Sequence, residues 1–141
     1  MSKLFPYIFF CLFILIVGCV DEKPSHLGMW QGEQNGDIGF IKLDESGGAY
    51  ILVKGDTLGG DGFEMEGNPV NLTYVIDDTN EKSHIDFILK LADGDIELLR
   101  IPGIYKFNST GDMVLCLNYN DSRRPTTFEK VDTVVLKKVA R

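Results

Sequence analysis

The sequence predicts an all-β domain, an antiparallel meander of about eight strands that closes into a β-barrel, behind an N-terminal signal helix. Three observations lead to this prediction. Apolar and polar residues alternate over short runs, which is the pattern of half-buried strands. Clusters of Gly, Asp, Asn and Ser separate these runs. One run and one turn together occupy about ten residues, as in a meandering sandwich or barrel.

The chain opens with the signature of an exported protein. A single basic residue, Lys3, precedes an almost unbroken apolar run from Leu4 to Val17. This run is shorter than the roughly 20 residues that cross a bilayer as a helix, and it fits the core of a signal peptide. The end of the run, Ile-Val-Gly-Cys, resembles the lipobox of bacterial lipoproteins. The resemblance implies cleavage between Gly18 and Cys19 and acylation of Cys19, so that residues 1–18 form the signal peptide.

The residues after the cleavage site are expected to form a short tether. Residues 19–26 are mostly polar and contain a proline, which suits a flexible link. Two or more acyl chains on Cys19 would give stable anchoring, because a single chain holds only marginally. In lipoproteins an aspartate after the lipidated cysteine retains the protein at the inner membrane. Val20 stands at that position, which favours the periplasmic face of the outer membrane in the cell envelope.

The remainder, residues 27–141, is long enough for one domain with its own core. Loss of Lys3 with the signal leaves 13 basic against 21 acidic side chains, a formal charge of −8. This acidic balance argues against nucleic acid as a partner. Loss of Cys11 and lipidation of Cys19 leave Cys116 as the one thiol, so a disulfide within the mature chain is excluded. Stability must come from packing.

Strand signals follow one another along the domain, and one short opening turn is the exception. Residues His26 to Trp30 read as a short helical turn, with Ser25 in position to cap it. The predicted strands are Ile38–Leu43, Ala49–Val53, Gly62–Gly67, Leu72–Asp77, His84–Leu91, Ile96–Ile101, Gly103–Phe107, Met113–Leu117 and Val134–Val139. The glycine-rich segment between Asp56 and Gly62 reads as a wide hairpin loop.

Alternation in the run around Cys116 separates two faces. Met113, Leu115 and Leu117 share the more apolar face, which is the better candidate for the core. Cys116 shares the other face with Val114. We expect Cys116 to lie on the outer face under a neighbouring element, or in a thin second layer, as a packed and unreactive thiol.

Most of the domain resembles a family of small lipocalin-like domains of unknown function that are common in exported bacterial lipoproteins. The resemblance rests on Leu27-Gly28-Met29-Trp30, Ile85-Asp86, Gly103-Ile104-Tyr105, Leu115-Cys116, Arg124-Pro125-Thr126-Thr127-Phe128 and Leu136-Lys137-Lys138. Gly28 follows Leu27 directly, one residue earlier than the family spacing, which leaves the start of the first strand open. The family implies a fold, and it implies no reaction.

The resemblance also implies how the barrel closes. The residues expected to close it are Trp30, Tyr105, Arg124, Pro125 and Phe128. In such barrels a tryptophan near the first strand plugs one end, and a basic residue of the final strands packs across its indole ring. Arg124 is the expected partner of Trp30, with Arg123 or Lys137 as substitutes. A cation–π contact of this kind contributes roughly 0.5 to 2 kcal/mol.

The sequence contains no set of residues that predicts an enzyme. His26 and His84 are the two histidines, and neither stands in a metal-binding spacing, so we expect no metal site and no cofactor. No serine lies in a nucleophile elbow.

Two functional hypotheses follow. In the first, the barrel holds a small apolar ligand. In the second, the barrel is filled, and its acidic surface engages another envelope protein as an inhibitor or assembly factor. Whether the barrel is hollow decides between them.

Overall fold

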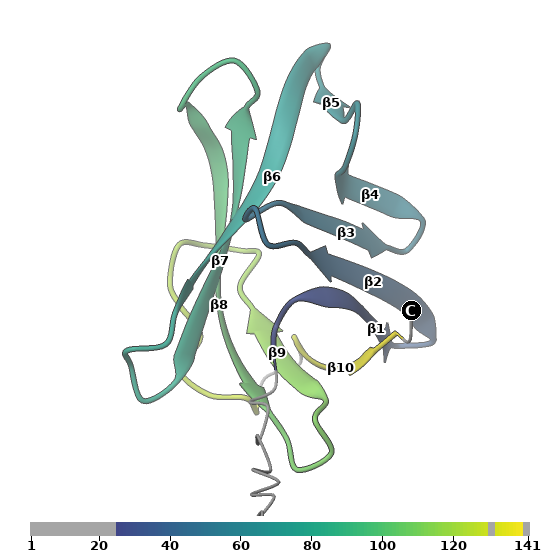
Figure 1. The fold of residues 1–141 in the computed structure, drawn as a ribbon, viewed down its shortest axis with the longest axis vertical. Coiled ribbons are helices and arrows are strands. Elements are labelled where there is room, and N and C mark those ends of the chain that lie inside the picture. Colours follow the sequence, from purple (N-terminus) through teal and green to yellow (C-terminus); the bar gives the residue numbers. More distant parts are fainter. Residues whose placement is uncertain (1–24, 130–131, 140–141) are drawn as a thin grey trace, which may run out of the picture.

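The computed structural model describes residues 25–129 and 132–139, which form an all-β domain without helices (Figure 1). Its ten strands are β1 (Gly28–Gln34), β2 (Asp37–Leu43), β3 (Ala49–Val53), β4 (Asp56–Gly59), β5 (Glu64–Met65), β6 (Asn68–Asp77), β7 (Ser83–Leu91), β8 (Glu97–Phe107), β9 (Met113–Leu117) and β10 (Thr133–Lys138). The predicted signal helix, residues 1–18, and the first part of the predicted tether lie outside the described residues.

The strands form one antiparallel sheet in the order β4-β3-β2-β1-β10-β9-β8-β7-β6-β5. Strands that follow one another in the chain are neighbours in the sheet, except β4 and β5, and the last strand pairs with the first. The sheet therefore has the cyclic order of a barrel that is interrupted at one place. We call the gap between the β3–β4 pair and β6 the seam. The sheet curls into a half-barrel that is open at the seam (Figure 1).

Contacts of the β2–β3 turn hold the seam together at one point. The amide of Tyr74 donates to the carbonyl of Gly47 over 2.9 Å, and the Tyr74 hydroxyl donates to the carbonyl of Asp44 over 2.6 Å. The Asp44 side chain orders this turn by accepting from the amides of Ser46 and Gly48. A short local loop thus replaces the missing strand pairing.

The concave side of the half-barrel is filled by apolar side chains. Every second residue of the long strands points inward, so the alternation in the sequence produces one continuous core. The core cluster comprises Trp30, Ile41, Leu43, Ala49, Ile51, Val70, Leu72, Tyr74, Ile85, Phe87, Leu89, Ile101, Tyr105, Met113, Leu115, Leu117 and Leu136. Each of these residues is buried.

The strand pattern differs from the sequence prediction in three ways. Residues 28–34 form β1 where a helical turn around His26 to Trp30 was expected, and β4 lies in the segment read as a loop. The runs Ile96–Ile101 and Gly103–Phe107 are one strand, β8, because Pro102 is accommodated within it. The described part therefore has ten strands where about eight were expected.

Candidate functional site

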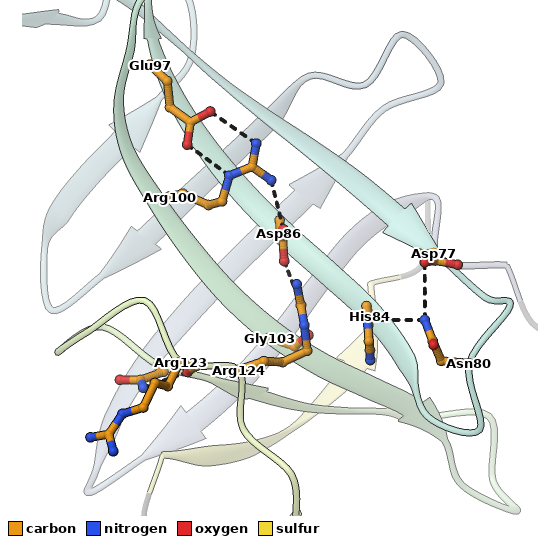
Figure 2. A network of polar contacts seen from close by, with 10 residues as sticks. Asp77, Asn80, His84, Asp86, Glu97, Arg100, Gly103, Arg123 and Arg124 are labelled. Atoms are coloured by element: carbon orange, nitrogen blue, oxygen red, sulfur yellow. Dashed lines mark hydrogen bonds and ion pairs between the residues drawn. The ribbon is translucent and has the colours of Figure 1, made fainter.

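Several residues singled out by the sequence meet at one polar network on the convex side of the sheet (Figure 2). At its centre is Asp86 of β7. Oδ1 of Asp86 lies 2.6 Å from Nη1 of Arg124, and Oδ2 lies 2.8 Å from Nη1 of Arg100. Arg100 also donates to both carboxylate oxygens of Glu97, over 2.8 and 3.0 Å. Nη1 of Arg124 donates in addition to the carbonyl of Gly103, over 2.8 Å.

The position of Asp86 follows from strand alternation. Ile85 and Phe87 belong to the core cluster, so Asp86 points to the opposite, convex side. Arg124 reaches it from the β9–β10 segment, by which we mean residues 118–129. This segment lies against the convex side of β7 and β8, and Arg124 attaches it to both strands at once.

The network fixes the protonation state of Asp86. Partial burial alone would raise the pKa of Asp86, but the hydrogen bonds from Arg124 and Arg100 outweigh burial and hold that pKa below its ordinary value. The hydrogen bond to Glu97, followed by the one to Asp86, raises the pKa of Arg100. A carboxylate with both oxygens bonded to guanidinium groups is a poor base. The arrangement is suited to holding chain segments together.

The β9–β10 segment covers a second apolar layer. Ile88, Ile104 and Cys116 are buried but do not belong to the concave core, and Cys116 is 0% exposed. The segment contributes a buried Pro125 to this side. This arrangement confirms the expectation that Cys116 lies on the outer face beneath a neighbouring element.

Further contacts hold the end of the β9–β10 segment. The ammonium group of Lys106 lies 4.6 Å from the centre of the Phe128 ring, and Phe128 is half-buried. Nζ of Lys82 donates to the carbonyl of Thr126. Phe128 therefore packs against the convex side of β8 rather than filling the interior.

Trp30 lies on the other side of the sheet from Arg124, so the predicted pairing of these two residues is wrong. The Trp30 ring is buried on the concave side, beside Phe107 at 5.9 Å between ring centres. Its Nε1 donates to the carbonyl of His26 over 2.8 Å. The cation above the indole ring is Lys138, with Nζ at 5.4 Å from the ring centre. The sheet itself separates Trp30 from the β9–β10 segment.

Tyr105 accompanies Trp30 in the interior. Its ring packs edge-on against Phe107, with 5.9 Å between ring centres, and its hydroxyl donates to Oδ1 of Asp78 over 2.8 Å. Burial, and then the hydrogen bond to Asp78, raise the pKa of Tyr105. The residues predicted to close the barrel therefore form two groups. Trp30 and Tyr105 lie inside, whereas Arg124, Pro125 and Phe128 brace the outside.

His84 belongs to a short chain of polar contacts at the start of β7. Nδ1 of His84 lies 3.3 Å from the side-chain amide of Asn80, which in turn donates to Asp77 over 3.1 Å (Figure 2). Asp86, two residues from His84, is engaged by the arginines. Among the described residues, no group of three or more His, Cys, Asp and Glu side chains is placed to hold a metal ion.

Two open grooves lie on the surface of the domain. One, of about 610 Å³, runs along the seam and is lined by residues that include Met29, Lys42, Tyr50, Asn71 and Thr73. The other, of about 560 Å³, lies over β1, β2 and β10 and includes Gln31, Ile38, Val135 and Lys137. Both are open to solvent.

Sequence reasoning missed the partners of Arg124 and of Trp30. In the sequence Asp86 stands out as part of the Ile85-Asp86 motif and as a neighbour of His84, although its apolar neighbours, Ile85 and Phe87, already indicate an acidic group on the face opposite the core. A partly buried carboxylate of this kind requires a cationic partner, and Arg100 and Arg124 are its two partners. Lys138 follows from the pairing of β10 with β1, in which it stands opposite Trp30.

The predicted cleavage and lipid-attachment residues, Gly18 and Cys19, lie outside the described residues. In the part that the structure describes, no helix is long and apolar enough to cross a membrane. Comparison of the chain with protein-family models, with curated proteins and with solved structures gave no match.

Proposed function

We propose that this chain is a lipid-anchored lipoprotein of the bacterial cell envelope, and that its lipocalin-like half-barrel works as a non-enzymatic interaction module. The observation that supports the interaction module is that apolar side chains fill the concave side of the half-barrel. A carrier of small molecules needs an internal pocket, of about 300 to 1,000 Å³ for a drug-sized ligand. Here large side chains such as Trp30, Phe87 and Leu43 occupy the space that a ligand would take.

The position of His26, close to the predicted anchor at Cys19, supports a defined orientation at the membrane. His26 packs edge-on against Tyr74, with 5.6 Å between ring centres, and its carbonyl accepts from Trp30. The seven Cα–Cα steps from Cys19 to His26 span at most about 25 Å. The end of the half-barrel that carries the β6–β7 turn would therefore face the membrane, with the periplasmic face of the outer membrane as the expected location.

A small apolar ligand remains the second candidate, because one observation favours it. Ile96, Leu98 and Leu99 are exposed at the end of the half-barrel that carries the β7–β8 turn. An amphipathic ligand could bury these side chains without entering the core.

The anchor is tested by metabolic labelling with radioactive palmitate. The Cys19→Ala variant should incorporate no label and should lose membrane attachment. The Cys11→Ala variant is the matched control, because it alters a cysteine within the signal and should be labelled like the wild type. Label on Cys19→Ala would contradict lipidation at this residue.

The module hypothesis is tested by native mass spectrometry of the full-length protein extracted from membranes with mild detergent. We expect the mass of the lipidated chain without an additional small molecule. A stoichiometric adduct that is lost on unfolding would contradict the module hypothesis and support the ligand carrier.

A further inference from the structure

Strand β8 is longer than β9, its neighbour on the side away from β7. Strand β9 pairs with β8 only over Gly103–Phe107. One residue earlier, the amide of Asn118 donates to the carbonyl of Pro102 over 3.0 Å. The chain then turns away from β8, because Oδ1 of Asn118 accepts from the amides of Asn120 and Asp121. In the described part of the chain, no strand continues along Glu97 to Ile101 on this side.

The open side of β8 presents backbone groups to solvent. The carbonyl of Pro102 points to the β9 side, so strand alternation directs the N–H and C=O groups of Arg100 to the same side. Unpaired groups of this kind are a template for another extended chain. Pro102 and the irregular pairing between Leu89 and Lys90 bound the free edge, which restricts it to a short partner strand of about five residues.

Apolar side chains stand beside this edge. Ile96 is 60% exposed, Leu98 is 47% exposed and Leu99 is 46% exposed. The two charged side chains on the edge, Glu97 and Arg100, pair with each other, and Arg100 also pairs with Asp86, so they do not shield their neighbours fully. In Figure 1 the β7–β8 hairpin lies beside the start of β6, at the end opposite the β6–β7 turn. With nine residues in β7, the two ends are about 30 Å apart.

The surroundings of the edge are acidic. The β7–β8 turn, residues 92–96, contains Asp93 and Asp95 and no basic side chain. Residues 60–67 carry Asp61, Glu64 and Glu66 and lie around β5, beyond β6 on the far side of β7 from the edge. The amide of Ala92 donates to the carbonyl of Pro69 over 2.9 Å, so the β7–β8 turn lies beside the start of β6. This charge favours a basic partner and disfavours a second copy of the chain, which would bring two acidic ends together.

We propose that the free edge of β8, Glu97–Ile101, together with Ile96, is a docking site for an extended segment of another envelope protein in which apolar and basic residues alternate. The segment adds to β8 as a strand, its apolar residues cover Leu98 and Leu99, and its basic residues meet the surrounding carboxylates. This inference rests on the proposed interaction module and names its surface and its kind of partner.

A peptide probe tests the chemistry of the site on the full-length protein in detergent micelles. The probe is a blocked seven-residue peptide of alternating valine and lysine, and the comparison is its valine–glutamate counterpart. We expect the lysine peptide to bind at least tenfold more tightly and to slow hydrogen exchange at the amide of Arg100. Leu98→Lys and Ile96→Lys should each weaken binding at least tenfold. Val135→Lys, at a residue of 48% exposure on β10, should change it less than twofold.

The docking site would be overturned by any of four results. These are absence of binding, equal affinity for the two peptides, unchanged hydrogen exchange at Arg100, and a loss of affinity in Val135→Lys as large as in Leu98→Lys.

A photo-crosslinking amino acid placed in turn at Ile96, Leu98, Val75 and Val135 separates this inference from the proposed function. Crosslinks to one defined protein from Ile96 and Leu98 alone support the β8 edge. Crosslinks to a defined protein only from Val75 or Val135 overturn the edge and leave the module intact. Absence of a defined crosslink from all four positions contradicts both.

Discussion

Asp86 and Arg124 form an ion pair of 2.6 Å across 38 residues of sequence, and this pair attaches the β9–β10 segment to the convex side of the sheet. The side chain of Asp86 is 13% exposed and that of Arg124 is 29% exposed, so water screens the pair only in part. Removing one partner of such a pair leaves the other charge partly desolvated, which is more costly than the loss of a surface ion pair.

The substitution Asp86→Asn should therefore lower the free energy of unfolding by about 2 kcal/mol, as measured by urea denaturation. It should also loosen the β9–β10 segment and speed the reaction of the buried Cys116 thiol with a maleimide. Asp121→Asn is the control, since it breaks an exposed pair with Arg123 within the same segment and should change both quantities much less. Equal effects of the two substitutions would show that Asp86 does not hold the segment.

The contribution of Asp86 should also depend on pH. Its pKa in the folded protein is lower than the ordinary value of 3.8, so folding favours the charged carboxylate. The stabilisation is complete well above that value, and it is lost as the pH falls through the lower folded pKa. The stability difference between wild type and Asp86→Asn should thus be constant from about pH 5 to 7 and should narrow below about pH 4. A difference that stays constant down to pH 2.5 would contradict this interpretation.

Gly103 of β8 lies where β8 and β9 approach each other closely, and its carbonyl accepts from Arg124. A Cβ atom at this position would lie 2.4 Å from Cδ2 of Leu117 and 2.9 Å from the carbonyl oxygen of Cys116. Gly103→Ala should lower the free energy of unfolding by about 2 kcal/mol, because β8 and β9 would have to move apart. Gly94→Ala is the matched control, since the nearest atom lies 3.9 Å from its Cβ position. We expect that control to change stability by less than about 0.5 kcal/mol in the same denaturation experiment.

The sequence was sufficient for the all-β class, most strand positions and the face on which Cys116 lies, because these follow from period-two alternation. It was not sufficient for β1. The hairpin signal for this strand was present in Asn35-Gly36, whose φ angles of 55° and 85° belong to a two-residue turn that few other pairs adopt. Lys54-Gly55 connects β3 to β4 in the same way, with φ angles of 54° and 81°.

The pairing of Trp30 could not be obtained from alternation alone. Alternation indicates that a residue faces inward or outward, but it does not indicate which distant segment crosses each face. The β9–β10 segment crosses the convex side, and that placement depends on the long-range contact between Arg124 and Asp86. A basic residue that a family resemblance assigns to Trp30 is therefore weak evidence for a cation–π contact.

The observed contact between Lys138 and Trp30 can be tested directly, because Trp30 is the single tryptophan. Lys138→Met keeps the apolar stem and removes the charge, so it should shift the fluorescence of Trp30 and lower stability by about 0.5 to 1 kcal/mol.

The same substitution should raise the pKa of His26, which is lowered by burial first and, in addition, by the charge of Lys138 against the opposing effect of Asp78. Nuclear magnetic resonance of the imidazole protons measures this change.

Lys137→Met and Arg124→Met are the two comparisons for the fluorescence shift. The first removes a charge one residue away on the opposite face of β10, and the second removes the cation that the sequence pattern had indicated. Neither should move the Trp30 emission of the folded protein. If Arg124→Met shifted that emission and Lys138→Met did not, the cation above the indole ring in solution would be Arg124, and the β9–β10 segment would have to lie inside the half-barrel.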